Sequence, residues 1–147
     1  MTVAIRPVRP EDFDQWAPLW EGYNTFYETV APEAVTRMTW ARFFDAYEPV
    51  HALVAEDAGR LVGLVHYVFH RSTWMIGPTT YLQDLFASPE ARGQGVGRAL
   101  IEAVYDAARE AGSTRVYWLT HETNATARLL YDRVAERSGF IQYRKAL

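Results

Sequence analysis

Hydrophobic residues recur at helical spacing in the first part of the chain. From Phe13 to Tyr27 they follow one another at intervals of three and four residues, which predicts an amphipathic helix. Pro10 and the acidic residues after it are typical of the first turn of such a helix. Pro18 is expected to kink it. A second helix is predicted over residues 39–47. The apolar stripe of the first helix consists of Phe13, Trp16, Trp20, Tyr23 and Tyr27.

The pattern then changes to that of β-strands. Residues 51–56 and 60–71 are rich in β-branched and aromatic side chains and flank the turn Asp57-Ala58-Gly59, which predicts a β-hairpin. Pro7 interrupts another strand-like run, and a proline suits a strand at the edge of a sheet. The remaining strands are predicted over residues 3–9, 79–88, 115–121 and 140–144.

The second half alternates strands with helices. Residues 96–111 form the most strongly amphipathic segment, with Gly112 at a position typical of a helix C-terminus. Another helix is predicted over residues 126–137. Strand–helix–strand units imply a parallel pair, and the hairpins imply antiparallel strands. We therefore expect a single α/β domain over residues 1–147, with a mixed, mostly antiparallel sheet and helices on both faces.

Composition narrows the range of functions. The 147 residues include no cysteine, which excludes a disulfide framework and a cysteine nucleophile, and no zinc-ligand pattern is present, so no metal is expected. The net charge of −3 is unlike the basic character of nucleic-acid binders, so no nucleic-acid partner is expected. No apolar run is long enough to span a membrane and no signal peptide is visible, so we expect no membrane partner and a cytoplasmic location. Five Trp and nine Tyr indicate either an aromatic core or an aromatic substrate pocket.

The segment richest in chemistry is a glycine-rich turn between a strand and the long helix. Its glycines leave successive backbone N–H groups uncovered at a helix N-terminus, an arrangement that favours an anion such as a diphosphate. The alternative is a turn that only permits tight packing. A nucleotide P-loop and a dinucleotide fingerprint both require further residues that are absent here. The turn reads Arg92-Gly93-Gln94-Gly95-Val96-Gly97.

This R-x-x-G-x-G run, preceded by residues 81–87 and followed by the strand VYWLT, Asn124 and Tyr131, resembles the GNAT superfamily of N-acetyltransferases. The similarity is greatest to the histone and polyamine acetyltransferase branch and is specific over residues 81–143. It implies a splayed parallel strand pair, acetyl-CoA as co-substrate, and direct transfer of acetyl to a primary amine in a ternary complex. A non-catalytic module that binds CoA on the same fold is the alternative.

The resemblance also implies roles for individual residues. Tyr131 would protonate the departing thiolate; the alternative role for a helical Tyr is core packing. Asn124 would bind the pantetheine arm, and it also suits a helix N-cap. The backbone of Leu85, Phe86 and Ala87 would pair with the same arm like an added strand. Backbone N–H groups would hold the pyrophosphate at Arg92, Gly93, Gln94, Gly95, Val96, Gly97 and Arg98.

The general base and the acceptor are less defined. Related polyamine acetyltransferases have Glu-Asp where this chain has Gln83-Asp84, and an amide cannot accept the proton. Asp84 is therefore the candidate base, with His121 and Glu122 as lesser ones, but alternation along the strand leaves its direction open. The resemblance implies that aromatic residues and acids upstream line the acceptor site, although the same residues would also suit a core. Such a set suits a cationic amine, whether a polyamine, another small amine, a lysine or a protein N-terminus. Its members are Tyr23, Phe26, Tyr27, Phe43, Phe44 and Tyr47, with Glu28 and Glu48. The helix that carries Tyr131 is about one turn longer than in many family members, which shifts the last strand. Because that strand often contributes to a dimer interface in relatives, the resemblance implies a homodimer.

Overall fold

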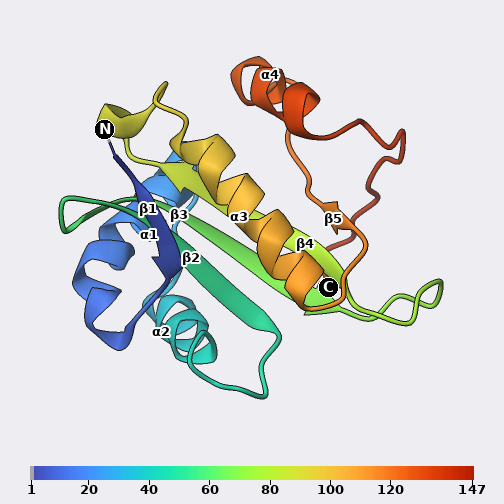
Figure 1. The fold of residues 1–147 in the computed structure, drawn as a ribbon, viewed down its shortest axis with the longest axis horizontal. Coiled ribbons are helices and arrows are strands. Elements are labelled where there is room, and N and C mark those ends of the chain that lie inside the picture. Colours follow the sequence, from blue (N-terminus) through green and yellow to red (C-terminus); the bar gives the residue numbers. More distant parts are fainter. Residues whose placement is uncertain (1) are drawn as a thin grey trace.

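The computed structural model describes residues 2–147 and is built on one five-stranded sheet (Figure 1). The strands follow in chain order across the sheet, and only the last pair, β4 with β5, is parallel. This confirms the predicted mixed sheet with a parallel pair. The strands are β1 (Ala4–Pro7), β2 (Val50–Asp57), β3 (Arg60–His70), β4 (Thr79–Ala87) and β5 (Val116–Tyr117).

Helices cover both faces of this sheet, as expected. On one face Trp16 and Leu19 of the first helix pack against Leu64 of β3, and on the other Leu100 and Ile101 lie in a separate core. Each face therefore has its own apolar cluster. The helices are α1 (Phe13–Phe26), α2 (Glu33–Arg42), α3 (Val96–Glu110) and α4 (Ala125–Val134), with short 3-10 turns η1 (Pro10–Asp12) and η2 (Pro89–Ala91).

Local signals in the sequence explain several of these boundaries. The β2–β3 hairpin turns at Ala58 and Gly59, whose φ angles of +49° and +81° are those of a type I′ turn. Gly112 ends α3 with φ +80°, as its position predicted. Pro7 lies at the edge of the sheet on β1. Within residues 2–147, none of the helices combines the length and the apolar character needed to cross a membrane.

Two helices differ from their predicted bounds. Helix α2 was predicted over residues 39–47, but it begins at Glu33 because extended Pro32 serves as its N-cap. It ends at Arg42, after which Phe43 and Phe44 donate to carbonyls three residues back and tighten the chain into a turn. Helix α4 ends at Val134, short of the predicted residue 137.

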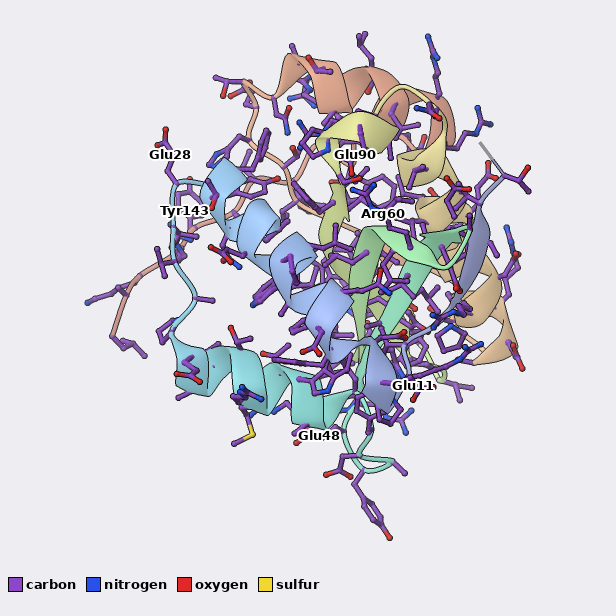
Figure 2. The ribbon with its side chains drawn as sticks, turned by 90° about the vertical axis from the view of Figure 1, so that its left-hand side faces the viewer. Glu11, Glu28, Glu48, Arg60, Glu90 and Tyr143 are labelled. Atoms are coloured by element: carbon purple, nitrogen blue, oxygen red, sulfur yellow. The ribbon has the colours of Figure 1, made fainter. Side chains whose placement is uncertain are left out.

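The prediction of a last strand over residues 140–144 was wrong. Residues 135–147 form neither helix nor strand, and in Figure 1 the ribbon after α4 runs past β5 without joining it. Phe140, Ile141 and Tyr143 are at least three-quarters exposed, and Figure 2 labels the last of them. A strand-like pattern is local, whereas a strand requires ladder hydrogen bonds from a partner. The predicted strand over 115–121 likewise shortens to two paired residues.

Candidate active site

The parallel strands β4 and β5 pair over a very short distance. Their ladder consists of Thr80 opposite Val116 and Tyr81 opposite Tyr117, and it ends there. The rest of β4 keeps β3 on one side only. The backbone N–H of Ser88 donates to the carbonyl of Val62 on β3. Because main-chain N–H and C=O groups alternate in direction along a strand, those of Leu85 and Ala87 point to the opposite edge of β4. Main-chain groups of β4 are thus available to an extended ligand beside them.

The glycine-rich turn follows at the end of this strand. Gly93 and Gly95 have φ angles of +75° and +81°, a conformation that residues with a Cβ rarely adopt. Consecutive backbone N–H groups over residues 93–98 have no acceptor among residues 2–147. Together with the positive end of the α3 dipole, these donors fit a diphosphate.

Two side chains also support the turn through hydrogen bonds that do not involve the N–H groups of residues 93–98. Arg92 donates from Nε to the carbonyl of Ala87 at 3.2 Å, and Gln94 donates from Nε2 to the carbonyl of Glu90 at 3.1 Å. The carboxylate of Glu90 in turn pairs with Arg60 at the β2–β3 hairpin, as their labelled side chains in Figure 2 illustrate. The conformation of the turn is therefore supported by the sheet and is not left to the ligand.

A β-bulge in β4 determines where Asp84 faces. His66 of β3 pairs with Asp84, whereas the next residue, Tyr67, pairs with Leu82, so Gln83 is the extra residue. The bulge lets Leu82 lie in the α3 core while Asp84 faces α1. Gln83 itself is exposed.

Asp84 is buried and held by a histidine that the sequence analysis had not assigned to the site. His66 Nδ1 lies 2.9 Å from Asp84 Oδ2, and His66 Nε2 accepts from the indole Nε1–H of Trp16 at 3.0 Å. The side chains of His66 and Asp84 are 3% and 11% exposed. A buried polar group requires a hydrogen-bond partner. The histidine within the otherwise apolar run 61–69 was therefore the feature of the sequence that could have indicated such a pairing.

Three tyrosines face Asp84 from two elements. Burial, followed by the negative charge of Asp84, raises the pKa of Tyr23 well above its ordinary value. Burial and the same charge raise the pKa of Tyr27 and of Tyr81. These phenols remain protonated at neutral pH and form an aromatic wall beside one carboxylate, a combination suited to a cationic amine.

Tyr131 lies on α4 near the same wall. Its ring packs edge-on against Trp118, with centroids 5.4 Å apart. Burial, and to a lesser extent Tyr27, raises the pKa of Tyr131 to about 12. Tyr27 is therefore close enough to interact with both Tyr131 and Asp84, so the candidate acid and base share one aromatic neighbourhood.

The other predicted residues are distributed as follows. Asn124 occupies the N-cap of α4 without a side-chain capping bond, and its Nδ2 lies 3.5 Å from Thr120 Oγ1. The ring of His121 is 6.0 Å from that of Tyr27, whereas Glu122 is exposed.

Of the upstream aromatic residues proposed to line the acceptor site, Phe43 packs against His66 and Tyr47 is almost fully exposed. Glu48 pairs with Arg42 at 3.7 Å, and Glu28 is exposed. The part of that aromatic set nearest to Asp84 is therefore the face of α1 that carries Tyr23 and Tyr27.

The fold, the open strand edge and the glycine-rich turn agree with comparisons to known proteins. The model of the acetyltransferase (GNAT) family matches residues 15–135, and the chain belongs to this family. It is an N-acetyltransferase, an enzyme class whose co-substrate is acetyl-CoA.

Individual relatives are similar over different lengths. The D-amino-acid N-acetyltransferase HPA3 of Saccharomyces cerevisiae is 37% identical over 145 residues, covering 97% of this chain and 90% of that protein. The thialysine N-epsilon-acetyltransferase of Bos taurus is 35% identical over 89 residues, 55% of this chain and 52% of its own. The ribosomal-protein-alanine N-acetyltransferase structure from Brucella melitensis biovar Abortus 2308 shares the fold, with a TM-score of 0.82, 20% identity and full coverage of both chains.

Proposed function

We propose that this enzyme transfers acetyl from acetyl-CoA directly to a primary amine within a ternary complex. Acetyl-CoA supplies the acetyl group as an activated thioester. A new N–C bond forms as the C–S bond breaks, so the ammonium must lose a proton and the thiolate must gain one. The observation that carries the proposal is the buried carboxylate of Asp84, 2.9 Å from His66 Nδ1, with Tyr27 close enough to interact with both Asp84 and Tyr131.

Asp84 serves as the general base. A lysine-like amine has an ordinary pKa of about 10.4, so it arrives charged and must be deprotonated before it attacks. Asp84 faces α1, the side on which Tyr23, Tyr27 and Tyr81 lie, and its neighbour Gln83 is exposed. The burial of Asp84 and its contact with His66 support this role.

Tyr131 serves as the general acid. A thiol of the cysteine type has an ordinary pKa of roughly 8.5, so a phenol whose pKa is raised to about 12 keeps its proton at neutral pH and can donate it to the thiolate as the C–S bond breaks. No acyl-enzyme is required, which agrees with the absence of cysteine.

The co-substrate is held by main-chain groups. The main-chain groups of Leu85 and Ala87 face the open edge of β4 and would pair with the pantetheine arm, whereas those of Phe86 between them face β3. The N–H groups at the start of α3 would bind the pyrophosphate, since they have no acceptor among residues 2–147. The side-chain oxygen of Asn124 is not used in a helix cap and would bind the pantetheine arm.

A small free amine is the acceptor that best fits the site. The yeast and bovine relatives named above act, by name, on D-amino acids and on thialysine, both small molecules with a primary amine. The decisive assay measures release of free CoA with a thiol reagent, against D- and L-amino acids, thialysine, polyamines, an aminoglycoside and a histone peptide. Turnover with a small amine supports the proposal, whereas CoA binding without turnover on any acceptor supports a binding module. Intersecting initial-rate lines are expected for a ternary complex, and parallel lines would contradict it.

We also infer that two copies associate through residues 138–144. Phe140, Ile141 and Tyr143 are not covered by their own chain. Within residues 2–147, β5 pairs with β4 alone, so it also offers a free edge. Light scattering after size exclusion should give twice the monomer mass. A variant with Phe140→Asp and Ile141→Asp should give the monomer mass, and a monomeric wild-type protein would contradict the inference.

A further inference from the structure

The contact between His66 and Asp84 assigns a function to a residue outside the acceptor wall. We propose that His66 is a positioning residue, whose tautomer is set by Trp16 and which thereby directs and stabilises the carboxylate of Asp84. This inference rests on the proposed role of Asp84 as general base. His66 does not touch the amine or the thioester in this scheme and acts only through Asp84.

The hydrogen-bond chain determines which nitrogen of His66 carries the proton. An indole N–H can only donate, so His66 Nε2, 3.0 Å from Trp16 Nε1, must be an acceptor. The remaining proton of the neutral ring is therefore on Nδ1, which donates to Asp84 Oδ2 at 2.9 Å. A second proton on Nε2 would place two donors face to face and break the bond to Trp16.

The surroundings of the pair make this donor important. The ring of His66 is enclosed by Trp16, Trp20 and Phe43, with centroids 5.8, 5.2 and 5.0 Å away. Removal of a carboxylate from water disfavours its charged form, and a donated hydrogen bond offsets that effect. His66 thus supplies a fixed, uncharged donor that favours the ionised base without adding a positive charge that would repel an ammonium.

The other titratable groups that face Asp84 are phenols. Tyr23 and Tyr27 approach from α1 and Tyr81 from β4, and burial raises the pKa of all three, so they stay protonated across the pH range of the test. His121, after β5, lies against Tyr27. Helix α2 and the turn after it contribute Trp40 and Phe43 to this cluster, neither of which titrates.

The first test is independent of activity. Nitrogen-15 NMR of the imidazole rings in the full chain at pH 7, with His66 assigned by its loss in His66→Gln, should show a neutral ring protonated at Nδ1. A ring protonated at Nε2, or a doubly protonated ring, would overturn the proposal. The tautomer is measured on the wild-type protein, and the variant serves only to assign the signal.

The second test compares two tryptophans in the pH profile of kcat/KM. Trp16→Phe removes the donor that keeps Nε2 an acceptor, so the single ring proton can move to Nε2 and leave Asp84 without its Nδ1–H donor; the acid limb should therefore move to higher pH. Trp20→Phe is the matched control, because Trp20 packs on the same cluster but its indole donates to Thr36, not to His66. Its acid limb should remain at the wild-type position. Equal displacement in both variants, or none in either, would overturn the proposal.

Substitution of His66 itself separates positioning from packing. His66→Leu removes the donor, so kcat/KM should fall at least ten-fold and the acid limb should rise. His66→Gln can accept from Trp16 and donate to Asp84, so it should restore kcat/KM to within a few-fold of wild type. Failure of the Gln variant to improve on Leu counts against the positioning role. If Asp84→Asn remains fully active, the proposed base is wrong; if Asp84→Asn is inactive while Trp16 and His66 variants keep the wild-type profile, only the present inference fails.

Discussion

Trp118 and Tyr131 meet edge to face, with ring centroids 5.4 Å apart and planes inclined at 65°. Trp118 follows β5, so this contact ties α4 to the strand that diverges from β4. Helix α4 is also fixed from α3, because the hydroxyl of Tyr105 donates to the carbonyl of Val134 at 2.8 Å. The phenol of Tyr131 is therefore held by two elements on the same side of the molecule as the glycine-rich turn.

Tyr131→Phe tests this phenol as the acid. Loss of the proton donor should lower kcat by ten-fold or more, since a positioned acid contributes at least that much, while the dissociation constant for acetyl-CoA should stay within about two-fold. Steady-state kinetics and calorimetric binding measure the two quantities separately. Tyr143→Phe, at an exposed residue, is the control. Wild-type turnover in Tyr131→Phe would remove the acid role.

The same phenol links stability to alkaline pH. Its pKa of about 12 in the folded chain exceeds the ordinary value of 10, so the stability it contributes is full below pH 10 and is lost as pH rises toward 12. Between pH 8 and pH 11, the free energy of unfolding of wild type should therefore fall more than that of Tyr131→Phe, by on the order of 1 kcal/mol. Urea unfolding at both pH values measures this difference. Tyr47→Phe, at an almost fully exposed residue, should follow wild type, and an identical fall in all three proteins would contradict the prediction.

Two glycines of the turn provide a matched pair. Gly95 has φ +81°, so Gly95→Ala should strain the turn and displace its N–H groups, whereas Gly97 lies in α3 without a positive φ and its added Cβ would meet Leu130 at an ordinary 3.5 Å. We expect Gly95→Ala to weaken acetyl-CoA binding at least ten-fold and Gly97→Ala to change it less. Calorimetry with acetyl-CoA, alongside thermal melting to verify folding, decides this. Equal affinity in the two variants would argue against the turn as the diphosphate site.

The adjacent residues Gln83 and Asp84 make a second pair. Asp84→Asn removes the proton acceptor and should lower kcat/KM by about 100-fold or more. Gln83→Ala, at the exposed bulge residue, should keep kcat/KM within about three-fold of wild type. The measurement is the same CoA-release assay with whichever acceptor turns over. A larger loss in Gln83→Ala than in Asp84→Asn would assign the base elsewhere.

Much of the fold could be predicted because its signals are local. The hairpin at Ala58 and Gly59, the amphipathic run of α3 and the glycine-rich turn each depend on residues within one element. The start of α2 was missed because its signal is Pro32, outside the apolar pattern that was used. The last strand failed for the opposite reason, since residues 140–144 have the pattern but no partner strand within residues 2–147.

The candidate site was only partly predictable, because its key contacts join distant positions. His66 and Asp84 lie 18 residues apart in sequence, and Trp16 and His66 lie 50 apart. Neither spacing produces a motif. The direction of Asp84 could not be derived either, because the bulge depends on how β4 pairs with β3.

Because side chains alternate along a strand, the faces of Leu82 and Asp84 depend on how many residues lie between them and on whether one of these, Gln83, is accommodated as a bulge. In a regular strand, residues two apart face the same side, so Leu82 and Asp84 could not both keep their present faces if Gln83 stood between them without a bulge. Deletion of Gln83 would make them adjacent and leave both on their present faces. Insertion of a further residue between them, by contrast, would turn one of the two to the opposite face unless the bulge grew to hold it.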